Sequence, residues 1–178
     1  MSDNNKEGSD MDERKPGPLI DAVRDTARRS VLCWLATVDA QGQPNVSPKE
    51  VWAIANAQHV VVANIASPMT ARNIASQPKV CLSFVDVFVQ KGYKLVGTAQ
   101  VVQADDPDFI SWASPLLAMV GQRFAIQSVL VMAVQSVDPI VAPSYRFYPD
   151  KTTEVSQMES AMQAYGVQPR HAAPPAKD

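Results

Sequence analysis

Three polar side chains interrupt an apolar, strand-like segment of this 178-residue sequence. Asn45, Ser47 and Lys49 alternate with Val46 and Pro48, and a β-strand turns every second side chain to the same face. The spacing predicts that an amide, a hydroxyl and an ammonium group lie next to one another. Because Pro48 has no backbone N–H, the strand is expected at a sheet edge, or with a gap in its hydrogen-bond ladder.

A second polar interruption, at residues 64–70, follows the next apolar strand, where the chain is expected to enter a helix. Pro68 suits a first helical turn. Free backbone N–H groups at such a helix start, together with the hydroxyls of Ser67 and Thr70, would form a seat for phosphate. Lys49 on the neighbouring strand would add a positive charge. The alternative is that Ser67 or Thr70 only caps the helix and that Lys49 is solvated at an edge.

Residues suited to other kinds of chemistry are sparse. The sequence contains no glycine-rich phosphate loop, nucleophile elbow or paired-cysteine motif. His59 follows an expected turn and His171 lies near the C-terminus, so the two histidines do not suggest a catalytic triad. Cys33 and Cys81 lie in apolar segments and are expected to be buried, reduced thiols. No side chain is therefore assigned a catalytic or metal-binding role.

Composition and charge argue against several classes of function. The formal net charge is −2, which offers no positive field for a polyanion, so nucleic acid is not an expected partner. No apolar run approaches the roughly 20 residues of a membrane-spanning helix, and residues 1–15 lack the apolar stretch of a signal peptide. These features predict a cytoplasmic protein that does not bind membranes.

One domain is expected at 19–150, followed by a C-terminal helix within 151–167. Residues 1–18 and 168–178 are polar or proline-rich and are predicted to be disordered. Helices are expected at 19–29, from residue 67 or 70 to 76, from residues 105–108 onward, and at 154–165. Strands are expected at 31–38, 44–54, 59–64, 80–89, 94–103, 128–137 and 140–148, with a turn or bulge at Gly92. Strands joined by turns this short favour an antiparallel sheet, and a sheet of this many strands usually closes into a barrel.

Several of these segments resemble the pyridoxamine 5'-phosphate oxidase-like, FMN-binding split-barrel family. Their order along the chain carries the resemblance, which spans roughly residues 35–102. The segments are Leu35–Asp39, Pro44–Lys49, Val62–Asn64, Thr70–Ile74, Pro78–Val80 and Gly92–Ala99.

The resemblance implies a mainly β fold with peripheral helices, namely a six-stranded antiparallel split β-barrel. It also implies a homodimer that holds FMN between its subunits, with the partner subunit covering the flavin ring. By the same resemblance, the second strand and the strand-to-helix junction contact the ribityl chain and the phosphate. The implied cofactor-binding residues are Asn45, Ser47, Pro48, Lys49, Asn64, Ile65, Ala66, Ser67, Met69, Thr70 and Arg72.

The helix start differs from the pattern that this family commonly shows. Members place Lys or Arg there, beside the phosphate, whereas this chain has Met69 and Thr70. A charge-assisted hydrogen bond is roughly twice as strong as a neutral one. FMN affinity is therefore expected to depend on a cation from elsewhere in the chain, and the candidates are Lys49, Arg72 and Arg123.

The resemblance implies an FMN-dependent oxidoreductase that acts on a small molecule and takes electrons from a donor such as a nicotinamide. FMN carries the redox chemistry in such an enzyme, which agrees with the lack of nucleophile motifs. Two alternatives stay open: a non-catalytic flavin-binding protein, and a split barrel that binds another planar ligand (deazaflavin or haem) or none. Trp52 or Trp112 could stack on a planar cofactor, although each is more often a core or interface residue. Residues 140–148 and the helix at 154–165 are expected to pack across the dimer.

Overall fold

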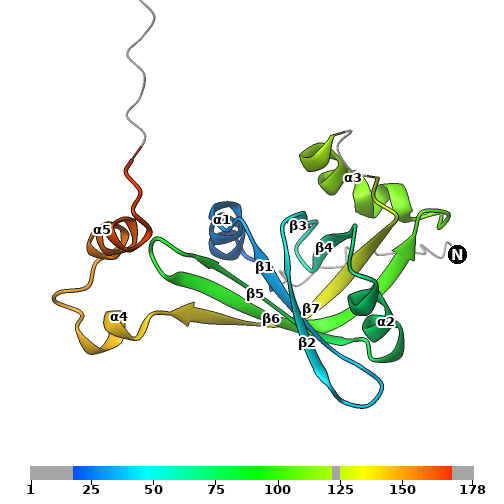
Figure 1. Ribbon diagram of the computed structural model, residues 1–178, viewed down its shortest axis with the longest axis horizontal. Helices are drawn as coiled ribbons and strands as arrows, with labels where there is room; N and C mark the ends of the chain where they lie inside the picture. Colours follow the sequence, from blue (N-terminus) through cyan, green and yellow to red (C-terminus); the bar gives the residue numbers. More distant parts are fainter. Residues whose placement is uncertain (1–17, 122–124, 170–178) are drawn as a thin grey trace, which may run out of the picture.

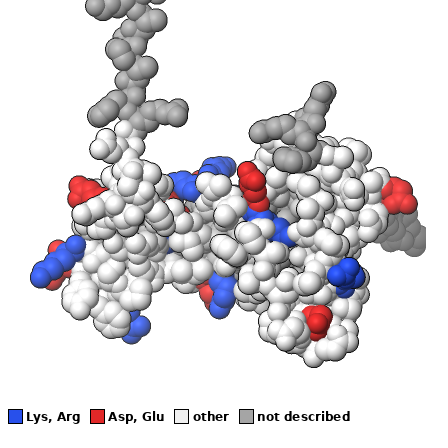
Figure 2. Space-filling model, viewed as in Figure 1, with Lys and Arg blue, Asp and Glu red and all other residues white. Residues whose placement is uncertain are grey.

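The computed structural model describes residues 18–121 and 125–169. The tails predicted to be disordered lie almost entirely outside these ranges, as does Arg123. Figure 1 shows a strongly curved sheet surrounded by helices, with a long extension on one side. Charged side chains of both signs are scattered over the face shown in Figure 2. Among the described helices, none is both long and apolar enough to span a membrane.

Seven antiparallel strands form a single sheet in the order β2-β1-β5-β6-β7-β4-β3. The strands are β1 (Cys33–Val38), β2 (Pro44–Lys49), β3 (Trp52–Ile54), β4 (His59–Asn64), β5 (Lys79–Asp86), β6 (Lys91–Gln103) and β7 (Ser128–Val141). The mainly β, antiparallel architecture predicted from the sequence is confirmed.

The sheet curls into a split barrel because its two outermost strands are neighbours in the chain. β2 and β3 lie at opposite ends of the strand order, yet only Glu50 and Val51 connect them. A connection this short forces the two edges together. The single strand expected at 44–54 is therefore wrong in detail, because it breaks where the chain crosses from one edge to the other. Counted as one bent strand, β2 and β3 give the six strands that the family resemblance implies.

The barrel interior is filled by apolar side chains from every strand except β2. α1 (Asp21–Arg29) contributes Val23 and α2 (Pro68–Ser76) contributes Ile74 to this same core, so both helices cover it. Full burial of one such side chain stabilises the fold by about 1.5–3 kcal/mol. The large side chains of this core include Leu35, Trp52, Leu82, Phe84, Leu95 and Met132.

A second apolar cluster lies outside the barrel, under α3 (Phe109–Val120). Phe109, Leu116 and Val120 of this helix pack with Val61 of β4 and Val129 of β7. Alternate residues of β4 therefore face two different cores, which explains why nearly the whole strand is apolar.

The C-terminal part of the chain differs from the prediction. Instead of two strands at 128–137 and 140–148, β7 runs unbroken from Ser128 to Val141 and pairs with β6 along its length. A short helix, α4 (Pro143–Phe147), follows, with a proline in its first turn. α5 (Glu154–Tyr165) has the predicted bounds, set by a Thr153–Ser156 capping box and a left-handed Gly166. α4, α5 and the adjoining ends of β6 and β7 form the extension in Figure 1.

Two glycines allow β6 to approach its neighbours closely. Gly92, expected in a turn or bulge, instead pairs with Val85 inside the strand, and a Cβ there would lie 2.0 Å from the Phe84 carbonyl oxygen. The irregularity lies at Gly97, where the register with β7 shifts. A Cβ at Gly97 would lie 2.0 Å from the Ala133 carbonyl oxygen. Only glycine fits at either position without displacing backbone.

Candidate functional site

Lys49 is the last residue of β2, and its side chain is buried with only 5% of its surface exposed. Its ammonium group donates to Ser67 Oγ at 2.5 Å and lies 3.5 Å from Thr70 Oγ1. No carboxylate lies within ion-pair distance of Lys49 in the part of the chain that the structure describes. The β2 edge and the start of α2 therefore meet around a buried, positively charged group, which we call the phosphate corner (Ser47, Lys49, Ser67 and Thr70).

Ser67 precedes α2 but does not serve as a conventional cap. Its hydroxyl makes no capping hydrogen bond to the helix backbone and accepts from Lys49 instead. Thr70 is 1% exposed and shares a hydrogen bond of 3.2 Å with Ser47. The alternative that these hydroxyls only cap the helix, with Lys49 solvated at an edge, is therefore wrong.

Asn45 continues the line of polar side chains on β2, on the side of Ser47 away from Lys49. Asn45 Nδ2 donates to Thr37 Oγ1 at 3.4 Å, and Asn73 Nδ2 of α2 donates to the same oxygen at 3.0 Å. Thr37 and Asn73 are both buried. Sequence reasoning missed these two residues. Asn73 could have been found, because it lies three positions after Thr70 on the same helix face, whereas Thr37 is recognised only once the β1–β2 register is known.

Electrostatics make the corner receptive to an anion. Burial lowers the pKa of Lys49 from its ordinary value of 10.5. Cys33 pairs with Lys49 across β1 and β2, but burial raises the pKa of its thiol to about 12, so at neutral pH it supplies no negative charge. A buried ammonium without a counter-charge is costly. An anion bound beside Lys49 would offset that cost.

The other residues predicted to bind the cofactor lie around the phosphate corner rather than in it. Asn64 at the end of β4 donates to Ser128 Oγ at 2.9 Å, and its own Oδ1 is buried without a hydrogen-bond partner among residues 18–121 and 125–169. Ile65 packs against the apolar cluster under α3. Ala66 and Pro48 are exposed, and Pro48 pairs with Trp34 on β1.

A groove of about 440 Å³ lies between the β1–β2 hairpin and α2. It brings together three predicted residues, Asn45, Met69 and Arg72, with Asn73. Arg72 is exposed and forms no salt bridge within the described residues. Asp39, the one carboxylate in the lining, already accepts hydrogen bonds from the backbone N–H groups of the hairpin turn. The groove therefore presents a free cation close to the phosphate corner.

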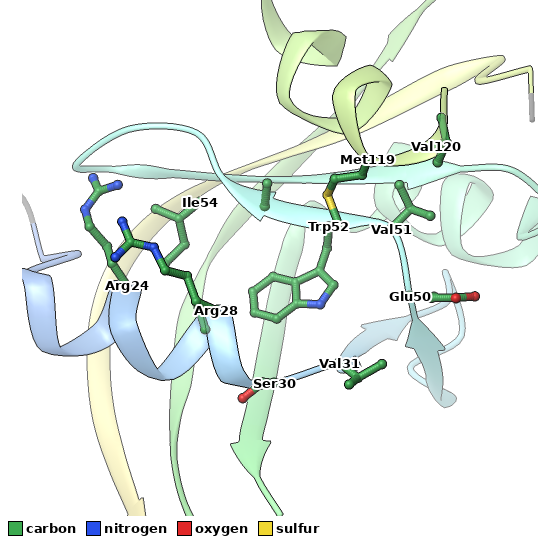
Figure 3. Close-up of a pocket in the computed structure, with 12 residues that line it drawn as sticks. Arg24, Arg28, Ser30, Val31, Glu50, Val51, Trp52, Ile54, Met119 and Val120 are labelled. Atoms are coloured by element: carbon green, nitrogen blue, oxygen red, sulfur yellow. The ribbon is translucent and has the colours of Figure 1, made fainter. Parts of the chain in front are cut away.

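Neither tryptophan considered as a stacking residue lies at the corner. Trp52 is 5% exposed in the barrel core, with its ring centre 5.1 Å from that of Phe84. Trp112 of α3 lies beside His59, with 5.1 Å between the ring centres. Trp52 does contribute to a separate, larger cavity between α1, β3 and α3 (Figure 3).

The class of protein follows from the fold and from the similarity of this chain to known proteins. Residues 19–159 match the family model of pyridoxamine 5'-phosphate oxidase, so the chain belongs to this family. Haem oxygenase HutZ of Vibrio cholerae is a relative with 29% identity over 119 residues. That match covers 63% of this chain and 64% of the relative.

Two solved structures show the same fold. HupZ of Group A Streptococcus has 23% identity and a TM-score of 0.60, covering 69% of this chain and 94% of HupZ. An FMN-binding protein of Syntrophomonas wolfei has 15% identity and a TM-score of 0.58, covering 68% of this chain and 85% of that protein. Both likenesses concern the split barrel itself and agree with the curled sheet described above.

The buried ammonium predicts a pH dependence of stability. Lys49 has a lowered pKa in the folded state, so the unfolded chain binds more protons between that pKa and 10.5. Stability therefore rises with pH across this window, and below it the full cost of burying the charge is present. We expect Lys49→Met to be at least as stable as the parent without ligand at pH 7, with the difference shrinking as the pH approaches 10.5.

Urea unfolding of both proteins at a series of pH values measures this difference. Both proteins also carry Cys33→Ala, because Lys49 lowers the pKa of the neighbouring Cys33 thiol and the titration of Cys33 would otherwise differ between parent and variant. A difference that stays constant or grows with pH would show that Lys49 is not a strained buried cation.

Proposed function

We propose that this protein is an FMN-dependent oxidoreductase that holds the flavin phosphate at the phosphate corner. The main observation behind this proposal is the buried Lys49 ammonium group. It contacts two hydroxyls and has no carboxylate partner among the described residues. A phosphate group would supply the missing negative charge and accept hydrogen bonds from Ser67, Thr70 and Ser47.

Lys49 would replace the cation that the family commonly places at the helix start. Met69 is 52% exposed there and offers no charge, whereas Lys49 reaches the same corner from the adjacent strand. Arg72, in the neighbouring groove, provides a second positive charge. The charge is thus supplied from β2 rather than from the first turn of α2.

FMN would supply the redox chemistry, accepting electrons from a donor such as a nicotinamide and passing them to a small-molecule substrate. The protein's own residues would bind and orient it. Lys49 and the hydroxyls would hold the phosphate, while Asn45 and Asn73, tied together through Thr37, would keep the wall beside it rigid. No protein nucleophile is needed, which agrees with the catalytic motifs absent from the sequence.

We further propose that the protein is a homodimer in the cytoplasm, with FMN between the subunits. The extension formed by α4 and α5 supports this arrangement, because it carries Phe147, Tyr148, Val155 and Tyr165, each at least 60% exposed. Exposed apolar side chains in such number are typical of an interaction surface.

Haem is the second candidate cofactor, because the relative HutZ is a haem oxygenase. A haem iron needs an axial ligand such as histidine. His59 lies beside Asn56 and Trp112, and His171 lies outside the described residues. The absorbance spectrum of the purified protein separates the two, since flavin bands would support FMN and a haem Soret band would contradict it. A flavin spectrum without turnover of any acceptor would instead indicate a non-catalytic flavin-binding protein.

Removal of the positive charge at the phosphate corner should weaken the binding of FMN but not that of riboflavin, which lacks the phosphate. Loss of a hydrogen bond to a charged group costs about 1.5–3 kcal/mol, so we expect Lys49→Met to raise the Kd for FMN about tenfold to a hundredfold. The Kd for riboflavin should hardly change. Flavin fluorescence titration measures both constants.

Lys79→Met is the matched control, because Lys79 is an exposed lysine at the start of β5. It should leave the affinity for both flavins unchanged. Equal loss of FMN and riboflavin in the Lys49 variant would refute the assignment of the phosphate to this corner.

Deletion of α5, which carries the exposed residues Val155 and Tyr165, tests the dimer. A chain that ends at Pro149 lacks α5 and its exposed apolar residues, so we expect a lower dimer fraction and less bound flavin. Light scattering after gel filtration and the flavin absorbance per chain measure these quantities. A chain that ends at residue 169 keeps α5 and serves as the control. An unchanged dimer and flavin content after the longer deletion would rule out this role.

A further inference from the structure

A cavity of about 540 Å³ lies between α1, the segment 50–54 and the end of α3 (Figure 3). Its size falls within the roughly 300–1,000 Å³ that is typical of small-molecule sites. Its walls are mostly apolar and include Trp52, Ile54 and Met119. The lining shares no residue with the phosphate corner, so the cavity is a separate place in the fold.

Two arginines one helical turn apart give this cavity a positive side. Arg24 and Arg28 extend from α1 toward β3 in Figure 3. The Arg24 Nε donates to the Leu19 carbonyl oxygen at 3.1 Å, which fixes the guanidinium at the cavity wall. Arg28 also contacts Asp25 at 2.8 Å, in an exposed pair that solvent screens.

A single carboxylate, that of Glu50, lies on the other side of Trp52 from the arginines in Figure 3. Among the described residues Glu50 forms no salt bridge. The cavity is therefore positive at one end, apolar in the middle and negative at the other end. This distribution disfavours a nucleotide or another polyanion, which would meet Glu50, and it disfavours a simple amine, which would meet two arginines.

We propose that this cavity binds an apolar organic monoanion, such as a medium-chain or aromatic carboxylate. The apolar body lies against Trp52 and Ile54, and the carboxylate is held by Arg24 and Arg28, whose planar guanidinium groups suit carboxylate oxygens. The inference does not rest on flavin binding, because Lys49, Ser67 and Thr70 contribute nothing to the cavity.

Three ligands with one tail and different head groups test the proposal. Octanoate, octanol and octylammonium are titrated into the full-length protein below their critical micelle concentrations, and binding is followed by calorimetry. We expect octanoate to bind at least tenfold more tightly than octylammonium. The double variant Arg24→Gln/Arg28→Gln should lose this preference. Arg146→Gln, which removes a positive charge from α4, is the matched control and should keep it.

The single variant Arg28→Gln is a second test in case the double variant misfolds, because it leaves the Arg24–Leu19 hydrogen bond in place. It should reduce the octanoate preference by itself. A preference for octylammonium in the parent, or an undiminished octanoate preference in both arginine variants, would overturn the proposal. Displacement of octanoate by FMN, mole for mole, would overturn it too, by making the cavity part of the flavin site. Lys49→Met should leave octanoate binding unchanged, so loss of flavin binding and loss of acid binding are distinguishable.

Discussion

The constraint on which the rest of the structure depends is the two-residue link, Glu50 and Val51, which joins the opposite edges of the sheet and closes the barrel beside Lys49. β2 lies at one edge of the sheet, and the two residues after Lys49 carry the chain to the other edge. The lysine therefore lies where the fold closes, and its side chain is buried there. A buried charge without a carboxylate partner among the described residues supports the proposed role of Lys49 in anion binding.

Two layers of support fix this charge. Behind it, the barrel core packs around Phe84 and Trp52, and the apolar cluster under α3 holds β4 from outside. Beside it, Thr37 accepts hydrogen bonds from Asn45 on β2 and Asn73 on α2, which ties strand and helix together. A binding group that is held by rigid elements loses little freedom when a ligand arrives, and pre-organisation of this kind favours affinity.

The features that depend on local periodicity could be predicted from the sequence, and those that depend on register could not. Alternation placed Asn45, Ser47 and Lys49 on one face, and the Pro68 segment marked a helix start, so the polar parts of the site were found. Thr37 was missed because nothing in an apolar strand signals which residue of another strand it will face. The break expected between residues 137 and 140, where Pro139 lies, is absent, and β4 pairs with β7 only as far as Ala133. Beyond that point β7 has a free edge, which tolerates a proline within the strand. Cavities depend on distances between helices, so the arginine-lined cavity had no counterpart in the sequence.

The two-residue link between opposite sheet edges also bears on the order in which the chain folds. β5 and β6 are close in sequence and pair early at little entropic cost, whereas the β4–β7 ladder must join Asn64 to Ser128 across a long loop. The barrel closes only when the β1–β5 and β4–β7 ladders have both formed, because these ladders join the strands on either side of the Glu50–Val51 link to the rest of the sheet. The contacts between Lys49 and the start of α2 are therefore expected to form late in folding, when the rest of the barrel is already in place.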